Sequence, residues 1–159
     1  MELESGESFI AISRSFLREY RDKIQICIER LSDEEVWWRP NDESNSAGNL
    51  LLHVTGSLRQ WIVSGIGGRH VHRLRQQEFD ERSRIPKDEL FSRLDSAVRE
   101  VDEVLSRIDP SQLLEKLQIF GKERTWMFVI YHMIEHFSMH AGQILMITKL
   151  KTARDLGLQ

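Results

Sequence analysis

Four long segments of the chain carry an apolar residue at every third or fourth position. This spacing places the apolar side chains on one face of an α-helix. The segments cover residues 8–31, 46–66, 86–108 and 125–150. The third has the clearest row of apolar positions, formed by Leu90, Leu94, Val98, Val101, Leu105 and Ile108. No strand pattern accompanies them, so the periodicity predicts an all-α protein.

Helices of this kind are marginal in water on their own, and each of the four has an apolar face to bury. Packing the faces together gives a four-helix bundle. The chain has 159 residues, close to the length of one domain. We therefore expect a single bundle domain over residues 1–159. The polar segment 69–85 is predicted to be a long connection between the second and third helices. It should contain a short helical turn and could run as a crossover along the bundle.

Shorter elements follow from local signals. Ser32 and Glu35 have the spacing of a capping box, which predicts a turn of helix through Trp38 that Pro40 ends. Residues 111–117 are predicted to form another short helix, followed by a turn at 121–124 that leads into the fourth long helix.

The composition argues against several classes of protein. Lysine and arginine number 22 against 25 aspartates and glutamates, and the resulting net charge of −3 is atypical of a nucleic-acid binder. No uncharged apolar run approaches the roughly 20 residues of a membrane span. The first residues are acidic, unlike a signal peptide. Cys27 is the single cysteine, which excludes an intrachain disulfide. We expect a cytoplasmic protein without a nucleic-acid or membrane partner.

Histidines are the residues most informative about chemistry. Three of the six, His53, His136 and His140, fall on the apolar helical faces. His136 and His140 are four residues apart, so their rings lie on one side of a helix and could reach one ion. A third imidazole from His53 on a facing helix would complete an open three-histidine site like that of catalytic zinc. The alternative is a set of hydrogen-bonded core histidines. His132 adds a competing pair with His136, and spacing does not choose between the pairs.

A second motif overlaps the first. Residues 132–136 fit the H-x-x-E-H pattern of inverted zinc proteases, in which Glu135 would be the general base. The alternative for Glu135 is a solvated helix residue.

Residues 49–61 and 136–144 resemble the corresponding segments of the DinB/YfiT-like superfamily, small four-helix bundles that hold a divalent metal. The resemblance covers nearly the whole chain. It implies metal ligands at His53, His136 and His140, because His140 precedes the Ala-Gly-Gln of the pattern. His132 is then a residue near the site or an ordinary core histidine. The resemblance also implies a homodimer.

The resemblance further implies a metal-dependent enzyme that transfers a low-molecular-weight thiol, or metal-activated water, to a small electrophilic substrate. The reacting group would be a metal-bound thiolate or water, and no catalytic side chain is assigned. Zinc, nickel and iron suit imidazole ligands. Two alternatives stand beside this reading. One is a non-catalytic metal-binding or stress-response interaction module, and the other is a hydrolase that uses Glu135.

Several other residues allow either a structural or a functional interpretation. Cys27 is expected to be buried and inert. Trp61 could wall the site or belong to the core, and Gln143 could orient a ligand. Asn49 could cap the second helix or enter the pocket. The basic segment 69–75 is expected to be a solvated loop, with binding of an acidic group as the alternative.

Overall fold

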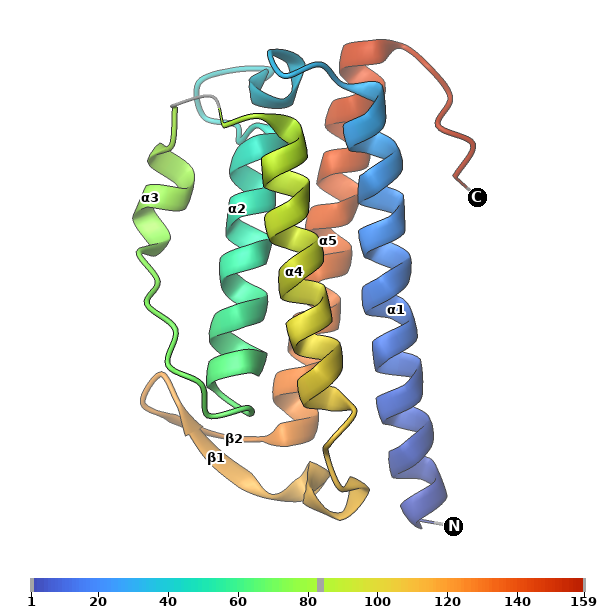
Figure 1. Ribbon diagram of the computed structural model, residues 1–159, viewed down its shortest axis with the longest axis vertical. Helices are drawn as coiled ribbons and strands as arrows, with labels where there is room; N and C mark the ends of the chain where they lie inside the picture. Colours follow the sequence, from blue (N-terminus) through green and yellow to red (C-terminus); the bar gives the residue numbers. More distant parts are fainter. Residues whose placement is uncertain (1, 83–84, 159) are drawn as a thin grey trace.

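The computed structural model describes residues 2–82 and 85–158, and it confirms the predicted all-α bundle. Four long helices pack side by side (Figure 1): α1 (Glu2–Arg30), α2 (Ala47–Leu58), α4 (Lys87–Leu105) and α5 (Trp126–Thr152). A π-helical turn, η2 (Arg59–Ser64), continues α2. The remaining elements are short: η1 (Glu35–Trp37), α3 (Arg75–Asp80), η3 (Pro110–Leu114), β1 (Lys116–Ile119) and β2 (Lys122–Thr125).

The helices run in an up-down-down-up order because the connection after α2 returns along the bundle. In Figure 1, α1 and α5 rise from the end that holds the N-terminus, whereas α2 and α4 both descend. Residues 69–82 climb back beside α2 and include the predicted helical turn, which is α3. The expected crossover is therefore present, and it places α3 against the outer side of α2.

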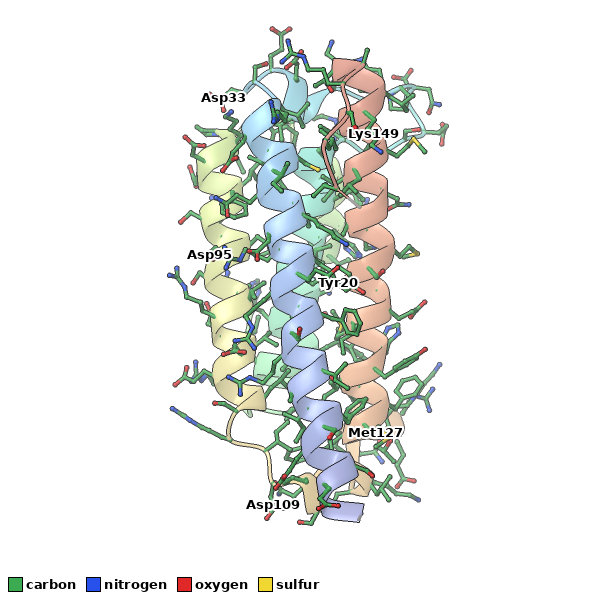
Figure 2. All side chains as sticks on the ribbon, turned by 90° about the vertical axis from the view of Figure 1, so that its right-hand side faces the viewer. Tyr20, Asp33, Asp95, Asp109, Met127 and Lys149 are labelled. Atoms are coloured by element: carbon green, nitrogen blue, oxygen red, sulfur yellow. The ribbon has the colours of Figure 1, made fainter. Side chains whose placement is uncertain are left out.

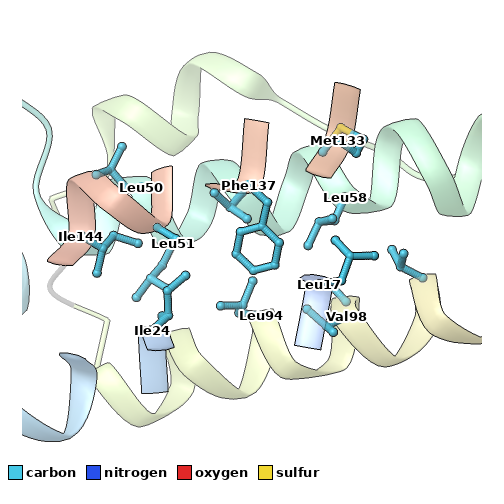
Figure 3. Packing of buried hydrophobic residues seen from close by; sticks show 14 of the residues in the cluster. Leu17, Ile24, Leu50, Leu51, Leu58, Leu94, Val98, Met133, Phe137 and Ile144 are labelled. Carbon is cyan, nitrogen blue, oxygen red and sulfur yellow. The ribbon is translucent and has the colours of Figure 1, made fainter. Parts of the chain in front are cut away.

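The core lies along the axis of the bundle and draws on all four long helices. Phe137 of α5 is fully buried and packs among Leu51 of α2 and Leu94 of α4 (Figure 3). Tyr20 of α1 points toward α5 (Figure 2), where its ring meets that of Phe137 edge-on at a centroid distance of 5.7 Å. Each such burial stabilises the fold by about 1.5–3 kcal/mol. Cys27 is fully buried, as expected.

The predicted short helix at 111–117 is wrong in its second half. Helical structure ends at Leu114, and β1 then pairs antiparallel with β2. The turn between them has positive φ at Phe120 (50°) and Gly121 (70°), as a tight hairpin turn requires. Four-residue strands are too short to show an alternating pattern, so the glycine was the main local sign of this turn.

Other boundaries move by a few residues. α1 begins at Glu2, six residues before the predicted start. The capping box at Ser32 and Glu35 is confirmed: the Ser32 backbone N–H donates to Glu35 Oε2 at 3.0 Å, and the Glu35 N–H donates to Ser32 Oγ at 3.1 Å. Among the helices of the described ranges, none is both long and apolar enough to cross a membrane.

A bidentate ion pair ties α1 to α4. Arg14 donates from Nε and Nη2 to the two carboxylate oxygens of Asp102, each at 2.8 Å. The hydrogen bonds from Arg14 lower the pKa of Asp102. A lowered folded-state pKa means that the pair stabilises the fold above the unfolded-state pKa, and that this contribution disappears as pH falls through the folded-state value.

We therefore expect Asp102→Asn to lower the free energy of unfolding by about 1 kcal/mol at neutral pH. The difference from wild type should shrink as pH falls below about 4, where Asp102 begins to protonate in the unfolded chain. Urea titrations of both proteins across this range measure the difference. A gap that stays constant down to the lowest pH would show that the carboxylate charge is not responsible.

Candidate metal centre

Three histidine rings meet between α2 and α5. His53 comes from α2, while His136 and His140 lie one turn apart on α5. The Nε2 atom of His136 stands 3.1 Å from His53 Nε2 and 3.1 Å from His140 Nε2. His53 and His140 are buried, and His136 is half-buried. Within the described ranges, these three residues form the one group of His, Cys, Asp or Glu side chains arranged to hold a metal ion.

Hydrogen bonds at the far side of two rings fix which nitrogen carries the proton. His53 Nδ1 lies 3.0 Å from Glu78 Oε2, and His140 Nδ1 lies 2.7 Å from Gln143 Oε1. Both partners are acceptors, and Glu78 lies closer to His53 Nδ1 than the Arg73 Nη2 donor does at 3.2 Å, so we assign the proton to each Nδ1. The Nε2 atoms of His53 and His140 therefore present lone pairs toward His136. The expectation that Gln143 orients a histidine agrees with this contact.

This arrangement suits a cation better than a hydrogen-bond network. One N–H on His136 Nε2 could donate to only one of the two neighbouring lone pairs, which leaves the other unpaired. A tetrahedral ion with N–metal distances of 2.0–2.1 Å separates its ligand nitrogens by about 3.3 Å, close to the 3.1 Å found for two of the three nitrogen pairs; all three ligand atoms lie within 4.8 Å of one another. Three neutral imidazoles with one side open therefore fit a divalent transition metal.

The electrostatics of the site keep the rings of His136 and His140 unprotonated at neutral pH. Burial, followed by the nearby imidazoles of His140 and His53, lowers the pKa of His136 to about 3. Burial also lowers the pKa of His140, and the hydrogen bond to Gln143 opposes this only in part. A neutral ring is the form that binds a metal, so no proton has to leave these two ligands near pH 7.

A buried ion pair behind His53 is the main part of the site that sequence reasoning missed. Arg73 donates to both Glu78 oxygens, from Nε at 2.6 Å and from Nη2 at 2.7 Å. The same guanidinium also donates to Gln60 Oε1 of η2 at 2.7 Å and to Ser57 Oγ of α2 at 3.0 Å. The side chains of Arg73 and Glu78 are only 6% and 12% exposed. The expected solvated loop is therefore wrong at Arg73.

The pair holds Glu78 in its charged form. Burial alone would raise the pKa of this carboxyl, but hydrogen bonds from Arg73 and His53 outweigh burial and lower the pKa. The glycine at position 56 makes room for the pair, because a Cβ there would overlap the Glu78 carboxylate and the Arg73 guanidinium. Glycine at that position of α2 is thus required by the close approach of α3 and its preceding loop.

Asn49 caps α2, one of the two roles considered for it, and also anchors α3. Its backbone N–H and side-chain oxygen complete the cap with Ser46 at the start of α2. Its Nδ2 then donates to the carbonyls of Glu78 at 2.9 Å, Phe79 at 3.3 Å and Glu81 at 3.3 Å. Asn49 lies one helical turn before His53, so it fixes the segment that carries Glu78 relative to the His53 ring.

His132 and Glu135 lie beside the cluster and not in it. The His132 ring is centred 6.0 Å from that of His136 and meets the Trp61 ring edge-on at 4.9 Å, and the His132 side chain is 34% exposed. The Glu135 side chain is 59% exposed, and its carboxylate lies 3.4 Å from His132 Nδ1. The H-x-x-E-H interpretation needs His132 and His136 as the ligand pair, whereas the rings that meet are those of His136, His140 and His53. His70 and His72 belong to no ligand group in the described part of the chain.

Solved structures of several bacterial proteins show the same architecture. A conserved protein from Enterococcus faecalis matches with a TM-score of 0.74 at 16% identity, covering 91% of this chain and 97% of its own. A DinB-like protein from Bacillus cereus ATCC 10987 has a TM-score of 0.71 at 16% identity, with 91% and 95% covered. A DinB-like protein from Bacillus subtilis has a TM-score of 0.71 at 17% identity, with 92% and 95% covered. At sequence identities of 16–17%, these similarities show a shared fold.

Sequence comparisons give a family as well. No curated protein matches the chain significantly. The family described as "Protein of unknown function (DUF1572)" matches residues 4–157, which is nearly the whole chain. This chain therefore belongs to the DUF1572 family, a DinB-like family, as its resemblance to DinB-like proteins predicts.

Proposed function

We propose that this protein is a metal-dependent enzyme in which His53, His136 and His140 hold a zinc, nickel or iron ion. Its reaction would be the transfer of a low-molecular-weight thiol, or of water, to a small electrophilic substrate. The observation that carries the proposal is the convergence of three Nε2 atoms, two of them with lone pairs fixed by Glu78 and Gln143. When bound, such an ion lowers the pKa of a thiol or water and makes it a nucleophile near neutral pH.

Three features of the chain's own residues support this role: the ion pair beside His53, the exposure of His136, and a neighbouring proton acceptor. The pair of Arg73 and Glu78 orients His53 and contributes no net charge, so a bound ion keeps its full positive charge for an incoming anion. The half-buried His136 marks the side from which a substrate can reach the cluster.

A proton acceptor stands next to that side. His132, which contacts Glu135, lies one turn from His136 and is partly exposed. In the proposed transfer the thiol sulfur forms a bond to an electrophilic carbon, the leaving group departs with its electron pair, and the thiol proton passes to His132.

The proposal predicts metal-dependent turnover. Apoprotein reloaded with zinc, nickel or iron(II) should accelerate the reaction of glutathione with chlorodinitrobenzene, and His140→Ala should reduce this rate to the uncatalysed background. The absorbance of the conjugate measures the rate, and His70→Ala, outside the cluster, is the matched control. Equal rates for the loaded wild type and His140→Ala would contradict the proposal.

Comparing this thiol-transfer assay with an ester-hydrolysis assay tests the alternatives. A hydrolase that uses Glu135 would release product from a chromogenic ester without any thiol and would lose this activity in Glu135→Gln. A non-catalytic interaction module would show neither reaction.

Exposed apolar side chains on α5 favour the interaction module as the second candidate function: Tyr131, Met139, Met146 and Leu150. A second copy packed on this face would form the predicted homodimer, and light scattering would then give twice the 18.7 kDa mass of one chain.

A further inference from the structure

A cavity at the other end of α2 from the π-helical turn plays no part in the metal centre. It has a volume of about 530 Å³ and is lined by segments far apart in the sequence: η1 and its flanks, the start of α2, Arg82 and the end of α5. In Figure 2 this end of the bundle is the one that carries the labels Asp33 and Lys149. The volume lies within the range of small-molecule sites, about 300–1,000 Å³.

Three cations line this cavity without a carboxylate partner among the described residues. Arg39 is half-buried and makes no hydrogen bond or ion pair there. Arg82 is exposed and, among the described residues, donates only to the backbone carbonyls of Phe79 and Glu81. Some arginines elsewhere on the bundle are paired, as Arg59 is with Glu100. A half-buried guanidinium without an acceptor is unfavourable, which suggests that a ligand supplies the missing anion.

The third cation, Lys151, lies with its Nζ 5.7 Å from the centre of the Trp38 ring. Two carboxylates also line the cavity. Glu35 is occupied by the Ser32 backbone N–H, and Glu34 is exposed. The cavity lining therefore carries three positive and two negative charges, which favours a ligand with one anionic group.

Two indole rings form the apolar part of the cavity wall, and that of Trp37 is held in place. Trp37 donates from Nε1 to the carbonyl of Ile85 at 3.0 Å. Its ring lies against Gly48, where an added Cβ would stand 2.9 Å from the indole. Trp38 is the neighbouring wall. Rigid aromatic walls reduce the entropy lost on binding and suit a planar ring.

We propose that this cavity, hereafter the tryptophan pocket, binds a small organic molecule that combines a planar ring with one anionic group, a carboxylate or a phosphate. Arg39 and Arg82 would hold the anion, and Trp37 and Trp38 would contact the ring. The proposal does not depend on a metal at the histidine cluster.

NMR of the four indole N–H groups tests this with an internal control. Benzoate and phenyl phosphate are the two probes, and they separate a carboxylate ligand from a phosphate ligand. Benzyl alcohol and inorganic phosphate test the ring and the anion alone. We expect saturable shifts of the Trp37 and Trp38 signals with at least one probe. Trp61 and Trp126 line no part of the tryptophan pocket, and their signals should not move.

Arg39→Met should weaken that binding about tenfold or more, the effect of losing one charge-assisted contact. Arg107→Met is the matched control, because Arg107 is exposed and lies outside the tryptophan pocket. Absence of saturable shifts for both probes would overturn the proposal. So would equal affinity in Arg39→Met and wild type, or stronger binding of benzyl alcohol than of benzoate.

Discussion

Replacing His140 with alanine should abolish stoichiometric metal binding. The ring of His140 supplies one of the three Nε2 atoms, and its lone pair is fixed toward the others by Gln143. Loss of a residue that only orients a ligand costs about 10–100-fold in metal affinity, so loss of the ligand itself should cost roughly a thousandfold or more. Calorimetric titration of the apoprotein with zinc measures the affinity, and circular dichroism verifies that the variant is folded.

The matched control for this experiment is His132→Ala. His132 is also on α5, one turn before His136, but it lies outside the cluster. We expect this variant to bind one equivalent of metal with an affinity close to wild type. A His132→Ala variant that loses the metal while His140→Ala keeps it would instead support the competing pair of His132 and His136.

Replacing Glu78 with glutamine should have the largest effect on stability of any change in the site. The side chain of Arg73 is 6% exposed, and Glu78 provides its charge partner. Removing one member of a buried pair leaves the other charge uncompensated and typically costs about 3–5 kcal/mol. The ring of His53 also loses its charged acceptor, so metal affinity should fall about 10–100-fold. Urea unfolding of the apoprotein and zinc titration measure the two effects separately.

Two further variants show whether the ion pair is the cause. Asp80→Asn changes an exposed carboxylate of the same helix, whose one hydrogen-bond donor among the described residues is Gln76, and should alter stability little. The double variant Glu78→Gln with Arg73→Met removes both charges, and it should be more stable than Glu78→Gln alone. If the double variant is instead less stable by the sum of both single effects, the two charges do not act as a pair.

The long helices were predictable because their cause is local and repeated. In α4, the row from Leu90 to Leu105 is apolar at helical spacing, and these residues are buried. The same reasoning placed His53 and His140 on buried faces, and both are buried. The histidine geometry could be anticipated because a spacing of four residues fixes the relative direction of two side chains on one helix.

The parts that escaped prediction depend on contacts between distant segments. Nothing near Arg73 or Glu78 in the sequence indicates burial, since each is a charged residue in a polar connection. Their burial follows from the return path of residues 69–82 along α2 and from the space left by Gly56. The hairpin of β1 and β2 likewise depends on cross-strand pairing, such as that between Lys116 and Thr125, which local periodicity does not report.

The most direct test of the metal centre is an anomalous-scattering map from crystals grown with zinc, nickel or iron. The account predicts one strong peak between α2 and α5, about 2.0–2.1 Å from the Nε2 atoms of His53, His136 and His140. A peak held by His132 and His136, or no peak between α2 and α5 when metal is present in the crystal, would contradict it.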